Sequence, residues 1–140
     1  MSMSCKNREL ISERNIDFIE RYRETMEQCD NTSIKDHVRI TIKKPAKRFY
    51  IEKERAYDII MFMENNVAFA SPNPNKIRMY DEIYIRYKAR MEKNPNAQKS
   101  DVIEAVINEP APEFYIGIHA AMKIINRNNT RVRRLRHEKK

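Results

Sequence analysis

The sequence predicts an all-α protein, built from two tandem three-helix repeats that pack as one pseudo-two-fold unit. Three observations predict it: one glycine in 140 residues, apolar residues at helical spacing, and an ungapped alignment of the chain with itself at an offset of 65 residues. A single glycine excludes glycine-rich phosphate loops, nucleophile elbows and glycine-turned hairpins. Helices joined by proline and asparagine turns remain as the favoured architecture.

The repeat is most visible in one segment that occurs twice. Residues 44–60 read KPAKRFYIEKERAYDII, and residues 109–125 read EPAPEFYIGIHAAMKII. At the same offset, residues 17–60 fall on residues 82–125 with 15 of 44 positions identical. Chance gives only a few identities over this length, so the sequence indicates an internal duplication.

The first helix of each repeat is predicted from NIDFIERYRETMEQ (residues 15–28) and YDEIYIRYKARMEK (residues 80–93). In both segments the apolar residues recur on one helical face, and asparagine-containing turns follow.

The second helix is expected to begin at Ser33 or Ser100, whose hydroxyl groups suit a helix N-cap. Asp36 and Asp101 follow in the first turn, where the helix dipole favours a carboxylate. Each helix should end before a proline, because the residue before proline avoids the α conformation.

The third helix follows Phe-Tyr-Ile in each repeat, from about residue 52 to 65 and from about residue 117 to 127. We expect Phe49, Phe114, Ile51 and Ile116 to fill the core, because aromatic and branched side chains bury large apolar areas. A short pairing of the two Phe-Tyr-Ile segments as strands is a further option. The predicted organisation is repeat 1 at residues 1–65, a linker at 66–76, repeat 2 at 77–126 and a basic tail at 127–140.

Composition limits the class of protein. The chain is 41% hydrophobic and 34% charged, which is typical of a soluble globular protein, and no apolar run is long enough to span a membrane. The N-terminal residues lack the apolar core of a signal peptide, so we expect a cytoplasmic location. The two cysteines match no metal spacing and are expected to be free thiols.

The positive charge gathers in two blocks. Residues 126–140 hold seven lysines and arginines against one glutamate, a net charge of +6, and residues 39–55 hold seven against two, a net charge of +5. The whole chain carries +8, so the remainder is slightly acidic. Clustered cations of this kind are the electrostatic pattern of a protein that binds a polyanion.

The repeated segment, residues 44–60 and 109–125, also suggests a helix-turn-helix. DVIEAVINE (residues 101–109) would brace GIHAAMKIINR (residues 117–127), which would read the major groove. Ala121, Ile124 and Ile125 would then point inward. Two features depart from the usual motif: the PAPEFYI turn is long, and repeat 1 places Glu52 and Glu54 where phosphates would approach.

RFYIEKERA, residues 48–56, resembles FYI-S-E-E-R-A segments of small basic, helix-turn-helix-like proteins encoded by phages and mobile elements of gut bacteria. The resemblance covers about a third of the chain. It supports the helix-turn-helix interpretation and names no characterised function.

The sequence therefore predicts a nucleic-acid-binding protein that is not an enzyme and needs no cofactor or metal, with double-stranded DNA as the favoured partner. The expected binding residues are His119 and Lys123 nearer the bases, and Arg127, Arg131, Arg133, Arg134 and Arg136 on phosphates. A second contact patch is expected at Lys43, Lys44, Lys47, Arg48 and Arg55.

Other partners fit the same charges. A protein-interaction adaptor that docks an acidic partner is the main alternative, and its surface would use the methionines and tyrosines. RNA binding uses the same cations. Attachment to a membrane surface is less favoured, because Val132 and Leu135 are the only apolar anchors in the tail. Catalysis has little support, since the three histidines are isolated.

Overall fold

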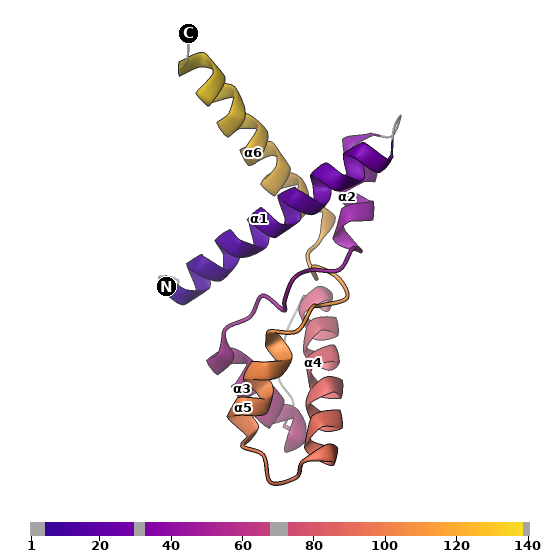
Figure 1. The fold of residues 1–140 in the computed structure, drawn as a ribbon, viewed down its shortest axis with the longest axis vertical. Helices are drawn as coiled ribbons and strands as arrows, with labels where there is room; N and C mark the ends of the chain where they lie inside the picture. Colours follow the sequence, from indigo (N-terminus) through magenta and orange to yellow (C-terminus); the bar gives the residue numbers. More distant parts are fainter. Residues whose placement is uncertain (1–4, 30–32, 68–72, 139–140) are drawn as a thin grey trace.

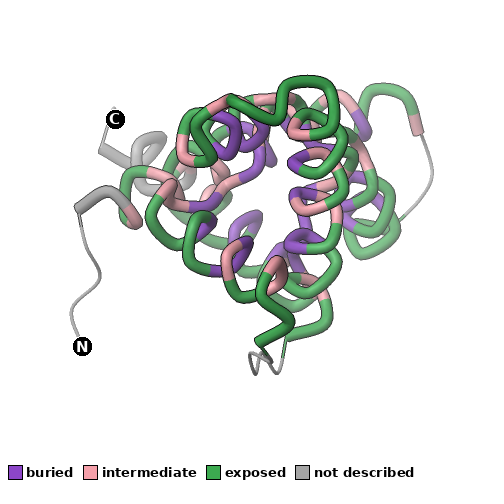
Figure 2. The backbone as a smooth tube through the Cα atoms, turned by 90° about the horizontal axis from the view of Figure 1, so that it is seen from below, coloured by how far each residue is buried: buried purple, intermediate pink, exposed green. Residues whose placement is uncertain are grey.

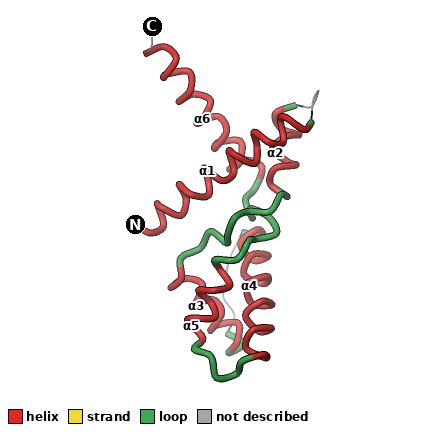
Figure 3. The backbone as a smooth tube through the Cα atoms, viewed as in Figure 1, coloured by secondary structure: helices red, strands yellow, loops and turns green. Residues whose placement is uncertain are grey.

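A computed structural model describes residues 5–29, 33–67 and 73–138 of the chain. Within these ranges every regular element is a helix, so the predicted all-α class is confirmed (Figure 3). The helices are α1 Cys5–Gln28, α2 Ile34–Ile42, α3 Lys53–Glu64, α4 Pro74–Lys93, α5 Lys99–Ile107 and α6 Ile118–Glu138.

Local sequence explains where the helices begin. The Ser33 hydroxyl accepts a hydrogen bond of 3.2 Å from the backbone N–H of Asp36, so the predicted cap of α2 is confirmed. The corresponding prediction for Ser100 is wrong, because α5 already begins at Lys99 and Gln98 occupies the cap position. α4 begins inside the predicted linker, where Asn73 caps the helix through the N–H of Asn75 and proline stands at its first position.

The six helices form two bundles, and each bundle takes its third helix from the other half of the chain. α1 and α2 pack with α6, whereas α4 and α5 pack with α3. In Figure 1, α3, α4 and α5 lie together below, and α1, α2 and α6 lie above them. The two connections that lead from α2 to α3 and from α5 to α6 therefore cross between the bundles.

This exchange overturns the expected helix-turn-helix pairing. Residues 101–109 were expected to brace the segment that becomes α6, but α5 and α6 make no packing contact within the described residues. α2 takes this bracing position instead. The reason lies in the connection from α5 to α6, which runs from Asn108 to Gly117 and is long enough to carry α6 into the other bundle.

The crossing connections are held together by reciprocal hydrogen bonds. Ala46 and Ala111 form an antiparallel bridge in which each backbone N–H donates to the other residue's carbonyl oxygen at 3.0 Å. The N–H of Phe49 donates to the carbonyl of Ile107 at 3.1 Å, and the N–H of Phe114 donates to that of Ile42 at 3.2 Å. All these partners are matched at the 65-residue offset.

The bridge also corrects the expected strand pairing. Residues 49–51 and 114–116 lie in no strand, and the backbone pairing falls three residues earlier, at the alanines that follow the two prolines. Pro45 and Pro110 cannot donate a backbone hydrogen bond, so pairing begins at the next residue.

The aromatic residues of the crossing fill the core, as predicted. Phe49 is fully buried, and Phe114, Ile51 and Ile116 are each at most 8% exposed. The ring of Phe114 meets that of Phe18 from α1 edge to face, with centroids 5.4 Å apart. Figure 2 shows the buried positions lining the inner sides of the helices. The crossing thus joins both bundles to one continuous core.

A buried carboxylate fixes the first crossing connection to α1. Asp17 is 2% exposed, and its Oδ2 accepts hydrogen bonds from the Tyr50 hydroxyl at 2.7 Å and from the N–H of Lys47 at 2.9 Å. Burial and this bond to Asp17 raise the pKa of Tyr50 well above its ordinary value.

Tyr115, the counterpart of Tyr50, is held differently. Its ring stacks on Phe49, the guanidinium of Arg78 lies over it, and its backbone has a positive φ of 55°. Desolvation by burial, with the nearby Glu82 and Glu113, raises the pKa of Tyr115 to about 12.

Because the pKa values of these two tyrosines are raised, we expect the fold to lose stability in alkali. Between the ordinary tyrosine pKa of 10.0 and about 12, Tyr115 stays protonated when folded but ionises when unfolded. The unfolded chain then binds fewer protons, so the free energy of unfolding falls as pH rises through this window. Urea unfolding at about pH 9 and about pH 11 should show the decline, and Tyr115→Phe should make it shallower. If an absorbance titration of the folded chain showed every tyrosine ionising with the ordinary pKa of 10.0, the prediction would be contradicted.

Candidate nucleic-acid interface

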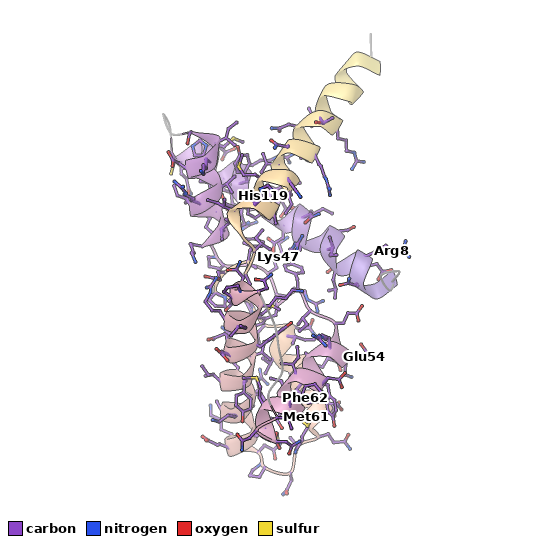
Figure 4. The ribbon with its side chains drawn as sticks, turned by 180° about the vertical axis from the view of Figure 1, so that it is seen from behind. Arg8, Lys47, Glu54, Met61, Phe62 and His119 are labelled. Carbon is purple, nitrogen blue, oxygen red and sulfur yellow. The ribbon has the colours of Figure 1, made fainter. Side chains whose placement is uncertain are left out.

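α6 buries an apolar face and exposes its cationic residues. Ala121, Ile124 and Ile125 are at most 8% exposed and pack inward, as the sequence predicted. The rest of the helix surface carries exposed side chains at His119, Lys123, Asn126, Arg127, Thr130 and Arg131. These positions recur every three or four residues and form one stripe along the helix. His119 stands near the beginning of α6 (Figure 4).

The predicted tail continues this helix. α6 runs without a break from Ile118 to Glu138, so the sequence RVRRLR is helical in the structure. The side chains of Arg133, Arg134 and Arg136 lie outside what the structure describes. In Figure 1 the C-terminal part of α6 extends away from the two bundles.

The cations of this stripe are electrostatically uncompensated in the described part of the chain. No ion pair between described residues involves Lys123, Arg127 or Arg131. The described side chains of α6 include no aspartate or glutamate. The stripe therefore offers its charge to solvent and to any anion that approaches.

Two polar residues lie between the cations: Asn126, which the sequence placed on the outward side of the helix without assigning it a contact, and Thr130, which was not among the predicted residues. Asn126 and Thr130 are exposed on the same stripe, and with Arg127 and Arg131 they line a surface hollow. The Thr130 hydroxyl donates to the carbonyl oxygen of Asn126 at 2.9 Å. Their four-residue spacing in the sequence was the signal that could have identified them.

The second predicted patch has a different electrostatic character. Lys43 forms an ion pair with Glu113 at 3.3 Å, and Lys47 forms one with Glu20 at 3.2 Å. The hydrogen bond from Lys47 lowers the pKa of the Glu20 carboxyl, as expected for a paired carboxylate. The ammonium group of Lys44 donates to the side-chain oxygen of Gln28 at 3.4 Å.

The remaining members of that patch point to separate places. Arg48 is half-buried and donates to the carbonyl of Phe49 at 3.2 Å. Arg55 is exposed on α3 and lines a hollow with Lys76 and Tyr80. The five residues therefore do not form one uncompensated surface as the α6 stripe does. Figure 4 shows Lys47 at the crossing, between the two bundles.

Other kinds of site find no counterpart in the described residues. No group of three or more histidine, cysteine, aspartate or glutamate side chains there is placed to hold a metal ion. None of the described helices combines the length and apolar character that crossing a membrane requires.

No protein-family model matches this sequence, and neither a curated protein nor a solved structure is detectably similar to it.

Proposed function

We propose that this chain binds double-stranded DNA through the exposed cationic stripe of α6, in a regulatory or architectural role and without catalysis. The observation that carries the proposal is that Lys123, Arg127 and Arg131 are exposed on one helical face with no ion pair among the described residues. Cations in this state neutralise phosphates and release counterions, which favours binding to a polyanion.

The shape of α6 suits a groove. A single helix fits the B-DNA major groove, and α6 presents its stripe from a bundle in which α1 and α2 support its apolar side. His119 and Lys123 near its beginning would lie closest to base edges. Arg127, Arg131, Arg133, Arg134 and Arg136 would contact phosphates, and Asn126 and Thr130 would add hydrogen bonds.

The second patch would contribute less. Lys43 and Lys47 already have carboxylate partners at 3.3 and 3.2 Å, so a phosphate would have to displace Glu113 or Glu20. Exposed ion pairs are weak, typically contributing less than about 1 kcal/mol, so a phosphate can displace the carboxylate. Breaking the ion pair still reduces the free energy that each lysine contributes to DNA binding. We assign these lysines to secondary backbone contacts.

The internal duplication and its pseudo-two-fold packing belong to the same proposal. At the 65-residue offset, α5 spans the residues that correspond to α2, and α6 begins at the residue that corresponds to the first residue of α3. The reciprocal bonds of Ala46 and Ala111 suit a pseudo-two-fold axis that passes between them. The resemblance of RFYIEKERA to segments from phages and mobile elements favours a role in such an element, in the cytoplasm.

The test is binding of labelled duplex DNA across a salt series. We expect the logarithm of the association constant to fall linearly with the logarithm of salt concentration, with a slope of about −3 to −6 for four to six phosphates. A duplex RNA of the same sequence serves as the comparison, because its narrow major groove does not admit a helix. Absence of DNA binding at low salt would refute the proposal, and tighter binding to the RNA would reassign the partner.

A further inference from the structure

α4 carries a stripe of apolar side chains that its own bundle covers only in part. Ile77, Tyr84 and Met91 stand seven residues apart, a spacing that returns to nearly the same side of a helix. Ile77 is 39% exposed, and Tyr84 and Met91 are partly exposed where they border the core. Figure 1 shows α4 at one side of the lower bundle. A straight apolar stripe of this kind allows a second helix to pack along it.

The C-terminal half of this stripe borders a surface hollow of about 330 Å³, and Tyr84, Lys88 and Met91 are among the residues that line it. Behind the hollow, the Tyr87 hydroxyl donates to Oε2 of Glu64 at 2.6 Å. Lys99 donates to Oε1 of the same carboxylate, also at 2.6 Å. The Glu64 carboxylate therefore has partners within the chain, and the surface of the hollow is mostly apolar. An apolar side chain is the occupant that such a hollow favours.

Two opposite charges flank the centre of the stripe. Asp81 lies three residues before Tyr84 and Lys88 four residues after it, so each is about one helical turn away. Both charged side chains are exposed, and neither forms an ion pair among the described residues. The ammonium group of Lys88 lies 5.0 Å from the centroid of the Tyr84 ring, which places this cation at the stripe. Turned end to end, the stripe therefore matches itself with its acidic and basic residues exchanged.

We propose that this stripe binds the same stripe of a second copy of the chain, with the two α4 helices antiparallel. Tyr84 packs against its own counterpart at the two-fold axis, and Ile77 of each chain enters the hollow beside Met91 of the other. Asp81 of each chain pairs with Lys88 of the other. Contact of one surface with its own copy is isologous, so the assembly closes after two chains.

The charges select the antiparallel arrangement. In a parallel pair, Asp81 would lie level with Asp81 of the second copy, and Lys88 with Lys88, which places like charges together. In the antiparallel pair both residues meet the opposite charge. Glu92, further along α4, then comes level with Arg78 of the second copy, which is again opposite in sign.

The corresponding side of α1 does not match itself in this way. At the 65-residue offset, Ser12 stands in place of Ile77, and Ile16 stands in place of Asp81. α1 therefore lacks both the apolar residue at the beginning of the stripe and the carboxylate beside its centre. The internal duplication explains the shared core positions of the two helices but not this stripe, and α1 offers exposed positions for matched controls.

The contact is a small one, made by one helix against another, which places it among weak and transient interfaces. The chain carries a net charge of +8, so two copies repel each other over long distances. At about 0.1 M salt this repulsion is screened beyond roughly 10 Å, whereas charges in contact still attract. Association is therefore expected at this ionic strength and at high protein concentration, and the dilute chains of a DNA titration remain single.

The experiment uses the full chain without DNA, so its result is independent of the proposed function. In sedimentation equilibrium, the weight-average mass of the wild-type chain should rise with concentration from 16.8 kDa toward the mass of two chains and no further. Asp81→Lys and Lys88→Glu should each stay monomeric, because each sets like charges opposite one another. Ile77→Asp should also stay monomeric, because it directs a carboxylate at the apolar hollow. All three residues are exposed, so the fold should be retained, and circular dichroism checks this.

Two further arms restore the opposite charges. In a mixture of the Asp81→Lys and Lys88→Glu chains, each changed side chain again meets an opposite charge, so the two variants should associate with each other. A single chain that carries both substitutions keeps the wild-type net charge and should associate like the wild type. Glu27→Lys and Arg23→Glu make the same changes in net charge at exposed positions of α1, and each should associate like the wild type.

Four outcomes would overturn the inference. They are a wild-type mass that stays at one chain at all concentrations, a mass that climbs beyond two chains, association that survives in the Asp81→Lys or Lys88→Glu variant alone, and failure of the mixture to associate. Association that survives in either variant would mean that the chains meet through another surface. If DNA binding fails while the mixture associates, the proposed function is wrong and the α4 contact stands.

Discussion

Replacing Lys123, Arg127 and Arg131 of α6 by glutamate should weaken binding to duplex DNA by about 100-fold or more at roughly 0.1 M salt. Each residue is exposed and pairs with no carboxylate among the described residues, so each is available to DNA. Losing the two phosphate contacts of Arg127 and Arg131 should also reduce the magnitude of the salt slope by about 1.8. Titration of labelled duplex at several salt concentrations measures both effects.

A matched variant separates this effect from net charge. Lys76→Glu, Lys88→Glu and Lys93→Glu remove the same amount of charge from exposed positions of α4, in the bundle that does not contain α6. This control should lose only a few-fold in affinity, through the long-range field of the protein. Equal losses in the two variants would mean that the α6 stripe is not the binding surface.

Phe18→Ala should lower the free energy of unfolding by about 3–5 kcal/mol. Phe18 is fully buried on α1, and its ring lies against that of Phe114 from the second crossing connection, with centroids 5.4 Å apart. The substitution leaves a cavity where the two halves of the chain meet, and the surrounding helices can relax only in part. Urea denaturation followed by circular dichroism measures the loss.

Ile16→Ala is the control for this core substitution. Ile16 lies on the same helix, two residues away, but is 59% exposed, so its replacement should change stability by less than about 0.5 kcal/mol. If Phe18→Ala proved equally mild, the contact between α1 and the second crossing connection would contribute little to stability.

The helices and the core residues could be predicted from the sequence, because the spacing of apolar residues within each segment is local information. Phe49, Phe114 and the Ala-Ile-Ile stripe are buried as expected, and the Ser33 cap is present. The cap at Ser100 was misplaced because a serine one residue inside a helix resembles a cap in sequence. Only the structure shows that Gln98 precedes the first turn.

The exchange of third helices could not be predicted in this way. α3 and α6 present the same inward residues, since Ala56, Ile59 and Ile60 are matched by Ala121, Ile124 and Ile125. The apolar pattern of the two helices therefore does not distinguish which bundle each one joins. The choice is made by the direction of the chain after Pro45 and Pro110 and by the bridge between Ala46 and Ala111, which are long-range features.

The candidate site was predicted in part for a related reason. Charge clustering is visible in the sequence, and it identified the exposed cations of α6. It could not show that Lys43 and Lys47 face Glu113 and Glu20, which are distant in sequence. It equally gave no sign that α2, rather than α5, supports α6.

The exchanged helices have a consequence for the order in which the protein can fold on the ribosome. α1 and α2 emerge first, but the bundle they belong to lacks its third helix until α6, beginning at Ile118, has been synthesised. α3 likewise waits for α4 and α5. The nascent chain therefore exposes the inward faces of α1 and α2 while α3, α4 and α5 are being synthesised, when chaperone binding and aggregation compete with folding. Closure of the first bundle becomes a late, long-range step, and it should be slow compared with the formation of any single helix.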